Sequence, residues 1–363
     1  MTRILATASP GEVRVLAERS GTLLDYAIWR PGRPDGVGDL HRGRVQARVP
    51  QMAGAFVLVE GATGFLPDSE GGANATEGET IGVRVTRAAQ GGKGPRLTAR
   101  LTADEARVVG TGPAPTLLRR GPGAVERLAA LYPDAAVLVD DPALAAALRP
   151  CLGERVALRQ DLADEGLTAQ VEMLTGTDTV LPGGLRASFH PTPALVAVDV
   201  DTAGATAGRQ RKAAALEALN RTALPALAAQ IRLRNLSGAI LVDLAGLSPK
   251  RRAALGPELV AALIADPLRP RLLGFTALGF AEIVRARVHP PLHELLSGPH
   301  AAGLTALRAM EREGATRLRT APDVAAALDA DAVARADLAR RTGRALILAV
   351  DPALPTCCWA LET

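Results

Sequence analysis

Residues 195–203 read LVAVDVDTA, and residues 238–247 read GAILVDLAGL. Both are short apolar runs rich in β-branched side chains, and an Ala/Leu/Arg pattern typical of a long helix separates them, from about residue 209 to 235. Apolar strands that alternate with helices are typical of a covered α/β sheet with parallel or mixed strands. We therefore expect both segments to be strands of such a sheet.

Three aspartates in these strands carry the clearest chemistry of the chain. Strand alternation places Asp199 and Asp201 on one face, roughly 6 to 7 Å apart, and such carboxylates are costly to bury without a cation. Asp243 ends the second apolar run, which is a common ligand position in α/β sheets. Mg²⁺ takes a few hard oxygens and leaves its other positions to water and substrate phosphate. The aspartates together predict a metal site that acts on a phosphodiester.

Each aspartate also has a purely structural alternative. Asp199 and Asp201 can lie at the exposed end of the strand and cap the TAGAT turn at residues 202–206, and Asp243 can cap the turn that follows it. No Ser-His-Asp, Cys-His or Walker pattern competes with the metal site. The histidines form no acid/base pair that the sequence can place. They are His41, His190, His289, His293 and His300.

The first hundred residues have the pattern of β structure. Residues 1–30 alternate apolar and polar positions around two turns, which predicts a β-meander that ends at the Pro/Gly-rich segment 31–38. Several short strands with glycine corners follow from residue 39 to about 101, and they predict a small closed barrel such as an OB-fold.

Two phenylalanines in this barrel suggest RNA binding. Exposed aromatic rings stack on unpaired bases while cations follow the phosphates. The alternative is that both rings belong to the barrel core. The rings are those of Phe56 and Phe65, and the surrounding cations are Arg42, Arg44, Arg84, Arg87 and Lys93.

Composition narrows the class of protein. The 363 residues include 48% hydrophobic and 22% charged residues, which is ordinary for a globular protein with two or three modules. Nearly all the basic residues are arginines, which suit phosphate, although a compositional bias would give the same excess. Cys151, Cys357 and Cys358 have no spacing that predicts zinc or a disulfide framework. No apolar run has the length of a signal peptide or a membrane span, so we expect a cytoplasmic protein.

Five segments resemble the ribonuclease E/G family. Two resemble its RNA-binding barrel, two resemble the segments that lead into its catalytic aspartates, and the last resembles the basic segment beyond them. They follow the family's order over about residues 1 to 295. The segments are residues 39–67, 90–101, 180–206, 230–247 and 278–292.

The resemblance implies a composite α/β and β fold, in which an OB-fold barrel interrupts an RNase H-like subdomain and a DNase I-like catalytic subdomain follows. A helical C-terminal tail with one strand, RALILAV, completes the chain. The implied boundaries are 1–36 and 104–183 for the RNase H-like subdomain, 37–103 for the barrel, 184–296 for the catalytic subdomain and 297–363 for the tail.

The resemblance also implies the roles of individual residues. The two magnesium ligands of the family fall on Asp199 and Asp243. The neighbouring active-site asparagine falls on Asp201, and we hypothesise that this third carboxylate acts in catalysis by tightening metal binding or changing metal preference. The RNA contacts that the resemblance implies are Phe56 and Phe65, which stack bases, Lys93 and Arg285. We also expect Arg42, Arg44 and Arg287 to bind RNA.

The activity implied is Mg²⁺-dependent cleavage of single-stranded RNA, which leaves 5′-phosphate and 3′-hydroxyl ends. Mn²⁺ is an alternative metal to Mg²⁺. Neither zinc nor a membrane is expected as a partner. Residues 102–115 replace the long insertion in which the family senses a 5′-monophosphate, so we expect cleavage independent of the 5′ end. A zinc-linked oligomer is not expected, because no Cys-x-x-Cys follows Pro291, but another homo-oligomer stays open. The alternatives are a non-catalytic RNA-binding protein on the same scaffold and a DNA-directed nuclease.

Overall fold

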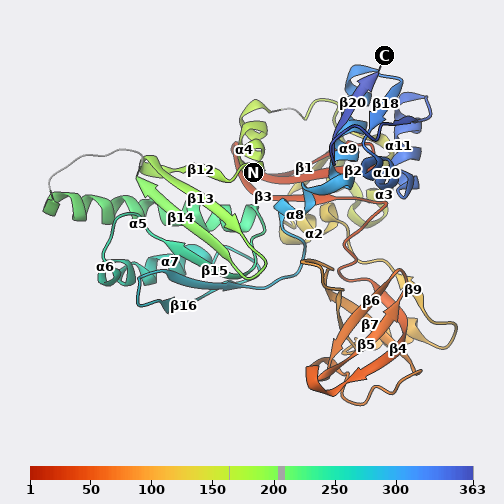
Figure 1. Cartoon of the computed structure of the whole chain (residues 1–363), viewed down its shortest axis with the longest axis horizontal. Coiled ribbons are helices and arrows are strands. Elements are labelled where there is room, and N and C mark those ends of the chain that lie inside the picture. Colours follow the sequence, from red (N-terminus) through yellow and green to blue (C-terminus); the bar gives the residue numbers. More distant parts are fainter. Residues whose placement is uncertain (163, 203–208, 363) are drawn as a thin grey trace.

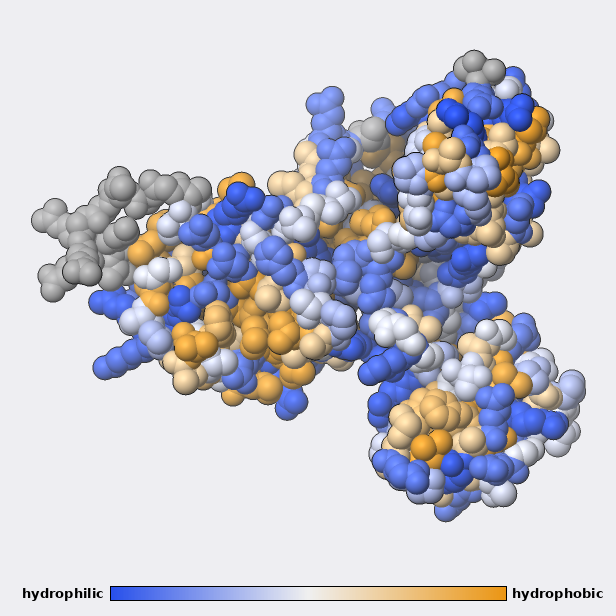
Figure 2. All heavy atoms as spheres, viewed as in Figure 1, coloured by the Kyte–Doolittle hydropathy of each residue, from blue (hydrophilic) through white to orange (hydrophobic). Residues whose placement is uncertain are grey.

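The computed structural model describes residues 1–162, 164–202 and 209–362. These residues build four sheets, and Figure 1 shows the barrel standing apart from the other three. Among them no helix combines the length and the apolar character needed to cross a membrane. Figure 2 shows a largely hydrophilic surface with smaller apolar areas. The mixed α/β character and the closed barrel expected from the sequence are confirmed.

The N-terminal sheet has the strand order β11-β10-β1-β2-β3. The predicted meander forms its antiparallel half, and β10 and β11 continue it in parallel with β1. Helices α2 and α3 pack on one face, and α4 packs on the other through Leu167 and Leu174. The elements are β1 (Thr2–Ser9), β2 (Glu12–Arg19), β3 (Thr22–Trp29), α2 (Ala124–Leu131), β10 (Ala136–Val139), α3 (Pro142–Leu152), β11 (Val156–Leu158) and α4 (Glu165–Thr175).

Five strands close the barrel in the order β5-β6-β8-β7-β4, and β4 also pairs with β5, which is consistent with an OB-fold. Aliphatic side chains such as Val57, Leu66 and Leu97 fill its core. The elements are β4 (Leu40–Val49), β5 (Gly54–Val59), β6 (Ala62–Pro67), β7 (Thr80–Arg87), β8 (Arg96–Thr98), α1 (Ala103–Val109) and β9 (Thr116–Arg119), with 3₁₀ turns at Pro50–Met52 and Asp68–Glu70.

The central sheet has the order β12-β13-β14-β15-β17-β16. Its core side chains, among them Val198, Val200 and Val242, pack against α5 and α7 on one face. The opposite face carries polar and exposed side chains, so this sheet has an open side. The elements are β12 (Asp178–Leu181), β13 (Leu185–Pro191), β14 (Val196–Thr202), α5 (Arg209–Leu233), β15 (Gly238–Asp243), α6 (Pro249–Ala254), α7 (Gly256–Leu263), β16 (Arg271–Phe275) and β17 (Ala281–Arg285), with a 3₁₀ turn at Pro182–Gly184.

The C-terminal unit differs from the expected helical tail with one strand. It contains a three-stranded sheet in the order β19-β18-β20. Its strands have four residues each, which is too short for alternation to distinguish them from loops. The elements from residue 292 onward are α8 (Leu292–Leu295), α9 (Gly298–Glu313), β18 (Arg317–Thr320), α10 (Pro322–Asp329), α11 (Ala332–Thr342), β19 (Ile347–Val350) and β20 (Trp359–Glu362).

Two short strands also cross the boundaries expected from the sequence. We assigned residues 104–183 to the first subdomain, but β9 pairs with β4 of the barrel and β12 pairs with β13 of the central sheet. Each strand has four residues, and the sheet that it joins is decided by hydrogen bonds to distant partners. The local sequence does not show which strands those partners are.

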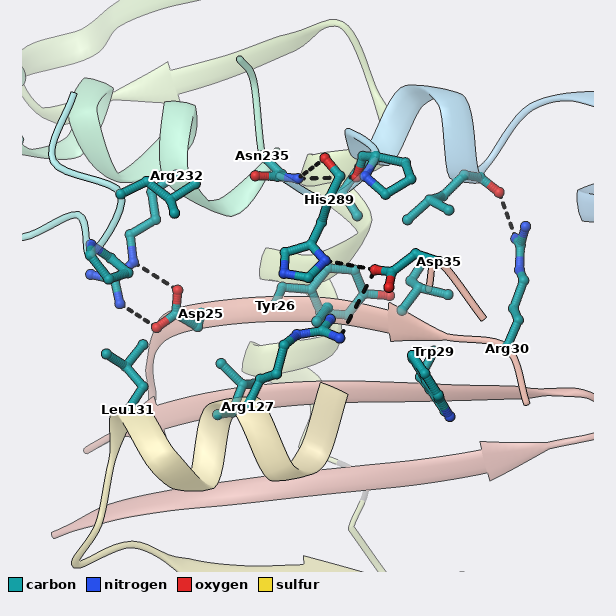
Figure 3. Close-up of a pocket in the computed structure, with 18 of the residues that line it drawn as sticks. Asp25, Tyr26, Trp29, Arg30, Asp35, Arg127, Leu131, Arg232, Asn235 and His289 are labelled. Carbon is teal, nitrogen blue, oxygen red and sulfur yellow. Dashed lines mark hydrogen bonds and ion pairs between the residues drawn. The ribbon is translucent and has the colours of Figure 1, made fainter. Parts of the chain in front are cut away.

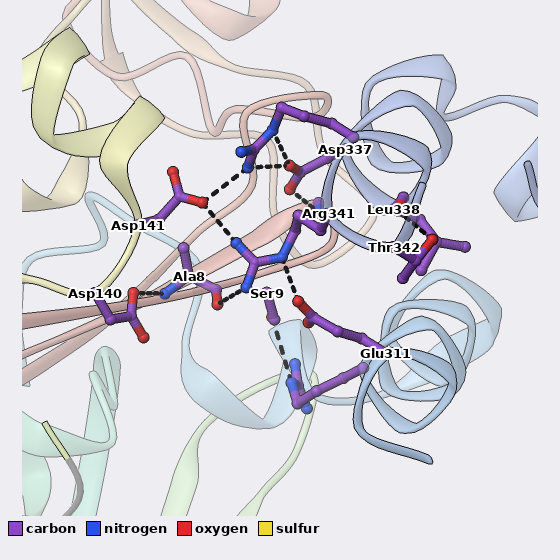
Figure 4. A network of polar contacts seen from close by, with 12 residues as sticks. Ala8, Ser9, Asp140, Asp141, Glu311, Asp337, Leu338, Arg341 and Thr342 are labelled. Carbon is purple, nitrogen blue, oxygen red and sulfur yellow. Dashed lines mark hydrogen bonds and ion pairs between the residues drawn. The ribbon is translucent and has the colours of Figure 1, made fainter. Parts of the chain in front are cut away.

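The C-terminal unit is bound to the N-terminal sheet by buried charge pairs. Arg341 donates to Asp141 and to the carbonyl oxygen of Ala8, as Figure 4 shows. Arg308 contacts Glu12, with 2.6 Å between Nη2 and Oε1. Gly11 is needed at this contact, since a Cβ there would lie 2.4 Å from the Cβ of Ala334.

Candidate active site

The sheet register brings Asp199 and Asp243 side by side. Strands β14 and β15 are parallel neighbours, and Asp199 pairs with Asp243 across them. Their backbones are therefore about 4.8 Å apart, the ordinary spacing of strands. Val198, Val200 and Val242 point to the helices, so both carboxylates lie on the open face.

The electrostatics of Asp199 distinguish it from an ordinary surface aspartate. Burial raises the pKa of its carboxyl group, and the negative charges of Asp243 and Asp201 raise it further. His190 and Arg252 act in the opposite direction without cancelling the rise. A carboxylate with too little positive charge around it is a typical cation ligand.

Arg252 lies next to Asp243, a contact that sequence reasoning missed. After β15 the chain turns and α6 carries Arg252 back over the strand end, where its Nη1 lies 2.5 Å from Oδ1 of Asp243. Despite this short distance, Oδ1 is buried and has no hydrogen-bond donor in acceptable geometry among the described residues. We regard the contact as a charge interaction that leaves a lone pair of Oδ1 free. The run PKRR directly after the strand was the available signal.

The donors at this site fit Mg²⁺ or Mn²⁺. Two adjacent carboxylates suffice for Mg²⁺, which keeps several waters and takes further oxygens from substrate phosphate. The buried, unpartnered Oδ1 of Asp243 is available to such an ion. Within the described residues, no three His, Cys, Asp or Glu side chains form a group that could hold a metal by themselves. The described residues thus offer one pair of carboxylates as candidate ligands, Asp199 and Asp243.

Asp201 lies two residues along the same face but has different neighbours. It is paired in register with Arg186 of β13, and the amide of Thr202 donates a 2.6 Å hydrogen bond to its carboxylate. The turn that the structural alternative invoked extends over residues 203–206, outside the described residues. A metal-binding role for Asp201 stays a prediction.

His190 is the histidine nearest to this chemistry. It is exposed on β13, opposite Ala197 and two residues from the register partner of Asp199. Other histidines contact acids elsewhere in the fold, as His289 does with Asp35 at 2.6 Å. Only the tertiary structure separates His190 from these structural pairs.

The barrel phenylalanines lie outside the barrel core. Phe56 and Phe65 are cross-strand partners on β5 and β6, with ring centroids 5.6 Å apart in an edge-on arrangement. Both are half-buried, whereas the neighbouring Val57 and Leu66 fill the core. The alternative that both rings are core residues is therefore wrong.

Two of the predicted RNA contacts have structural roles instead. Arg42 is buried and donates to the carbonyl oxygens of Val109 and Pro113. Arg285 is 4% exposed and pairs with Asp266, with Nε 2.6 Å from Oδ2. The structure does not support a direct RNA contact for either residue, since sequence shows a charge but not its partner. Arg44 and Lys93 are exposed, and Arg287 is half-buried.

A cavity of about 380 Å³ lies away from the two carboxylates, between the N-terminal sheet and the segment around residue 289. Figure 3 shows its charged groups paired with one another. Arg232 donates to Asp25 at 2.7 Å, and Asp35 lies between His289 and Arg127. These pairs connect the N-terminal and central sheets. We therefore place the candidate active site at Asp199 and Asp243 and not in this cavity.

The part of the chain that matches known proteins includes the central sheet. Residues 143–288 match the model of the Ribonuclease E/G family. The chain is 33% identical to Ribonuclease E of Nostoc sp. over 146 residues, which are 39% of this chain and 21% of that protein. Over 107 residues, 29% of this chain and 22% of that protein, it is 35% identical to Ribonuclease G of Escherichia coli.

Ribonuclease E of Escherichia coli is 31% identical over 129 residues, which are 35% of this chain and 12% of that protein. The aligned part thus spans about a fifth or less of each of these relatives. The matched range contains Asp199, Asp201 and Asp243, whereas the barrel precedes it. Through this segment the chain is similar to the ribonuclease E/G family.

Proposed function

We propose that this protein is a metal-dependent endoribonuclease that cleaves single-stranded RNA on the open face of the central sheet. The observation that carries the proposal is the pairing of Asp199 with Asp243 on adjacent parallel strands, inside the segment that matches the family. The relatives named Ribonuclease E and Ribonuclease G support RNA as the substrate.

The proposal assigns an RNase H-like fold to the N-terminal sheet and a DNase I-like fold to the central sheet. The order β3-β2-β1-β10-β11, with three antiparallel strands followed by two parallel ones, supports the first assignment. A mixed sheet with helices on one face and acidic residues on the other supports the second.

In the proposed mechanism, Asp199 and Asp243 hold Mg²⁺ or Mn²⁺. When bound, the ion supplies an activated water and neutralises charge on the phosphodiester. Arg252 lies beside Asp243 and is placed to contact a phosphate oxygen and stabilise the charge that develops there. The half-buried rings of Phe56 and Phe65 stack on bases and keep the bound RNA single-stranded.

Independence from the 5′ end is part of the proposal. Residues 102–115 form α1 and the short connection to β9, and Glu105 of α1 pairs with Arg84 of the barrel at 2.7 Å. This segment therefore serves as a structural brace of the barrel. That use supports a short form without a sensor for the RNA end.

A non-catalytic RNA-binding scaffold is the second candidate, and one observation favours it. Arg252 contacts Asp243 at 2.5 Å, so its guanidinium partly compensates the carboxylate that a metal would otherwise neutralise. On this alternative the aspartates would persist as structural charges and the barrel alone would act.

The test is cleavage of a fluorescent single-stranded RNA with a 5′-hydroxyl or a 5′-monophosphate, in Mg²⁺ or EDTA. Asp199→Asn and Asp243→Asn are compared with wild type and with Asp134→Asn, a control at an exposed aspartate remote from the site. We expect Mg²⁺-dependent cleavage that both active-site variants lose, that the control keeps, and that ignores the 5′ group. A matched DNA strand in the same assay separates a ribonuclease from a DNA-directed nuclease.

Binding without cleavage under every condition would favour the scaffold alternative. The Asp201→Asn variant tests the third carboxylate in the same assay. We expect it to need about threefold more Mg²⁺ for half-maximal cleavage, because removal of a nearby charge weakens cation binding. An unchanged Mg²⁺ requirement would remove Asp201 from the site.

A further inference from the structure

A row of four side chains runs across the outside of the barrel. Phe56 of β5 pairs in register with Phe65 of β6, Phe65 pairs with Arg96 of β8, and Arg96 pairs with Arg87 of β7. All four are half-buried and stand outside the barrel core. At about 4.8 Å per strand spacing, the row extends about 15 Å from two aromatic rings to two guanidinium groups.

The cationic end of this row meets the central sheet. The amide of Ala88, the residue after Arg87, donates a 2.8 Å hydrogen bond to the carbonyl oxygen of Val288. Arg87 precedes Ala88 and Arg287 precedes Val288, so the two arginines flank this hydrogen bond. The charges of Arg96 and Arg287, together with burial as the largest cause, lower the pKa of Arg87.

Arg87, Arg96 and Arg287 have no ion-pair partner in the described part of the chain, and the carboxylate that lines a pocket with Arg287 is that of Glu294. None of their side chains takes part in an ion pair or a hydrogen bond there, whereas the nearby Arg84 has Glu105 and Arg285 has Asp266. The Nε of Arg87 is moreover buried without a partner. Three like charges held together this way repel, and an anionic ligand would offset that repulsion.

We propose that Arg96, Arg87 and Arg287 form a phosphate-binding cluster that passes the backbone of single-stranded RNA from the barrel to the central sheet. The inference rests on the proposed function and adds the route of the substrate. Planar guanidinium groups bind phosphate oxygens through paired hydrogen bonds. The adjacent rings of Phe56 and Phe65 stack bases, which requires a single strand.

The cluster also lies at a useful distance from the carboxylates. Arg287 covers Gly238 at the start of β15, where a Cβ would lie 2.4 Å from its Nη2. Asp243 ends the same strand, five residues later, or about 17 Å at about 3.3 Å per residue. An extended RNA strand of a few nucleotides would span this separation.

The salt dependence of RNA binding tests this cluster. Fluorescence anisotropy in EDTA gives the affinity for a single-stranded RNA at several salt concentrations. Each lost phosphate contact flattens the slope of log affinity against log salt by about 0.7, so the triple variant R87Q/R96Q/R287Q should lose about 2 in slope. We expect its affinity at low salt to fall roughly 10- to 100-fold.

Two control variants show whether the change of slope is specific to the cluster. Arg149→Gln changes the same charge at an exposed position of α3 and should leave slope and affinity unchanged. Phe56→Ala should lower affinity with little change of slope, since stacking releases no counterions. A single-stranded DNA of the same sequence should lose the same slope in the triple variant, because the cluster contacts phosphates. A fully duplex RNA should bind weakly to wild type.

The outcomes separate this inference from the proposed function. A wild-type slope in the triple variant, with RNA still bound, would overturn the cluster and leave the ribonuclease proposal intact. Failure of wild type to bind any single-stranded RNA would overturn both. Thermal unfolding should show the triple variant at least as stable as wild type, because repulsion is removed. If the triple variant did not fold, the single variants would decide, with a slope loss of about 0.7 each.

Discussion

Carboxylates occupy two contrasting regions of this molecule. Where the C-terminal unit meets the N-terminal sheet, Asp141 accepts from Arg340 and Arg341, at 2.8 and 2.7 Å, and Glu12 lies among three arginines. On the open face of the central sheet, Asp199 and Asp243 lie next to each other. Asp199 has no ion pair in the described part of the chain, and Asp243 contacts one cation, Arg252. Carboxylates thus stabilise the fold in one region and, in our proposal, bind a cation in the other.

The pKa directions express this difference. At the junction, burial alone would raise the pKa of Asp141, but hydrogen bonds and charge from Arg340 and Arg341 lower it overall. At the open face, burial and the neighbouring carboxylates both raise the pKa of Asp199. Acids with raised pKa values cluster at functional sites, whereas acids paired with arginine are typical of structural networks.

The largest expected effect comes from the same type of change, Asp to Asn, made once in each region. Asp243→Asn should reduce RNA cleavage about 100-fold or more, because a metal ligand is lost, with little change in stability. Asp141→Asn should leave cleavage nearly unchanged and lower the free energy of unfolding by about 2 kcal/mol, because two arginines lose a buried partner. Cleavage assays and urea denaturation of both variants measure this. Equal effects of the two variants on cleavage would contradict the comparison.

Glu12→Gln should be the most destabilising change at the junction that leaves the site intact. Glu12 is buried and contacts Arg14, Arg30 and Arg308. Its removal leaves these cations without a counter-charge, and we expect a loss of about 2 to 3 kcal/mol in the free energy of unfolding. Glu172→Gln, at an exposed position of α4, is the matched control and should change stability by less than about 0.5 kcal/mol.

Acid should weaken the junction. Folding lowers the pKa values of Glu12 and Asp141, so their contribution to stability is present above the ordinary values of 4.5 and 3.8. It is lost as the pH falls through the lower values of the folded protein. Thermal unfolding between pH 7 and pH 3 should therefore show a steeper loss for wild type than for Glu12→Gln. Parallel curves would mean that Glu12 contributes no such stability.

The smallest effect has the opposite sign. Asp199→Asn should stabilise the metal-free protein at pH 7 by about 0.5 kcal/mol, because it removes one of two like charges on neighbouring strands. Folding raises the pKa of Asp199, so protonation already relieves the repulsion in acid and the gain should disappear near pH 3. Thermal unfolding in EDTA measures it. Added Mg²⁺ should stabilise wild type and not this variant.

Sequence alone determined the local features of this protein. The period of two placed Asp199 and Asp201 on one face of their strand, because strand alternation needs no distant partner. Glycine corners and close spacing predicted the barrel. The α/β character and the family resemblance followed from the same segments.

Tertiary structure decided the rest, because partners in a sheet or an ion pair come from distant parts of the chain. The register that sets Asp199 beside Asp243, the contact of Arg252 with Asp243 and the hydrogen bond from Ala88 to Val288 are all long-range contacts. The same holds for the burial of Arg285, whose charge suggested RNA, and for the three short strands after residue 316. Alternation shows which way a side chain points, and only the fold shows what it meets.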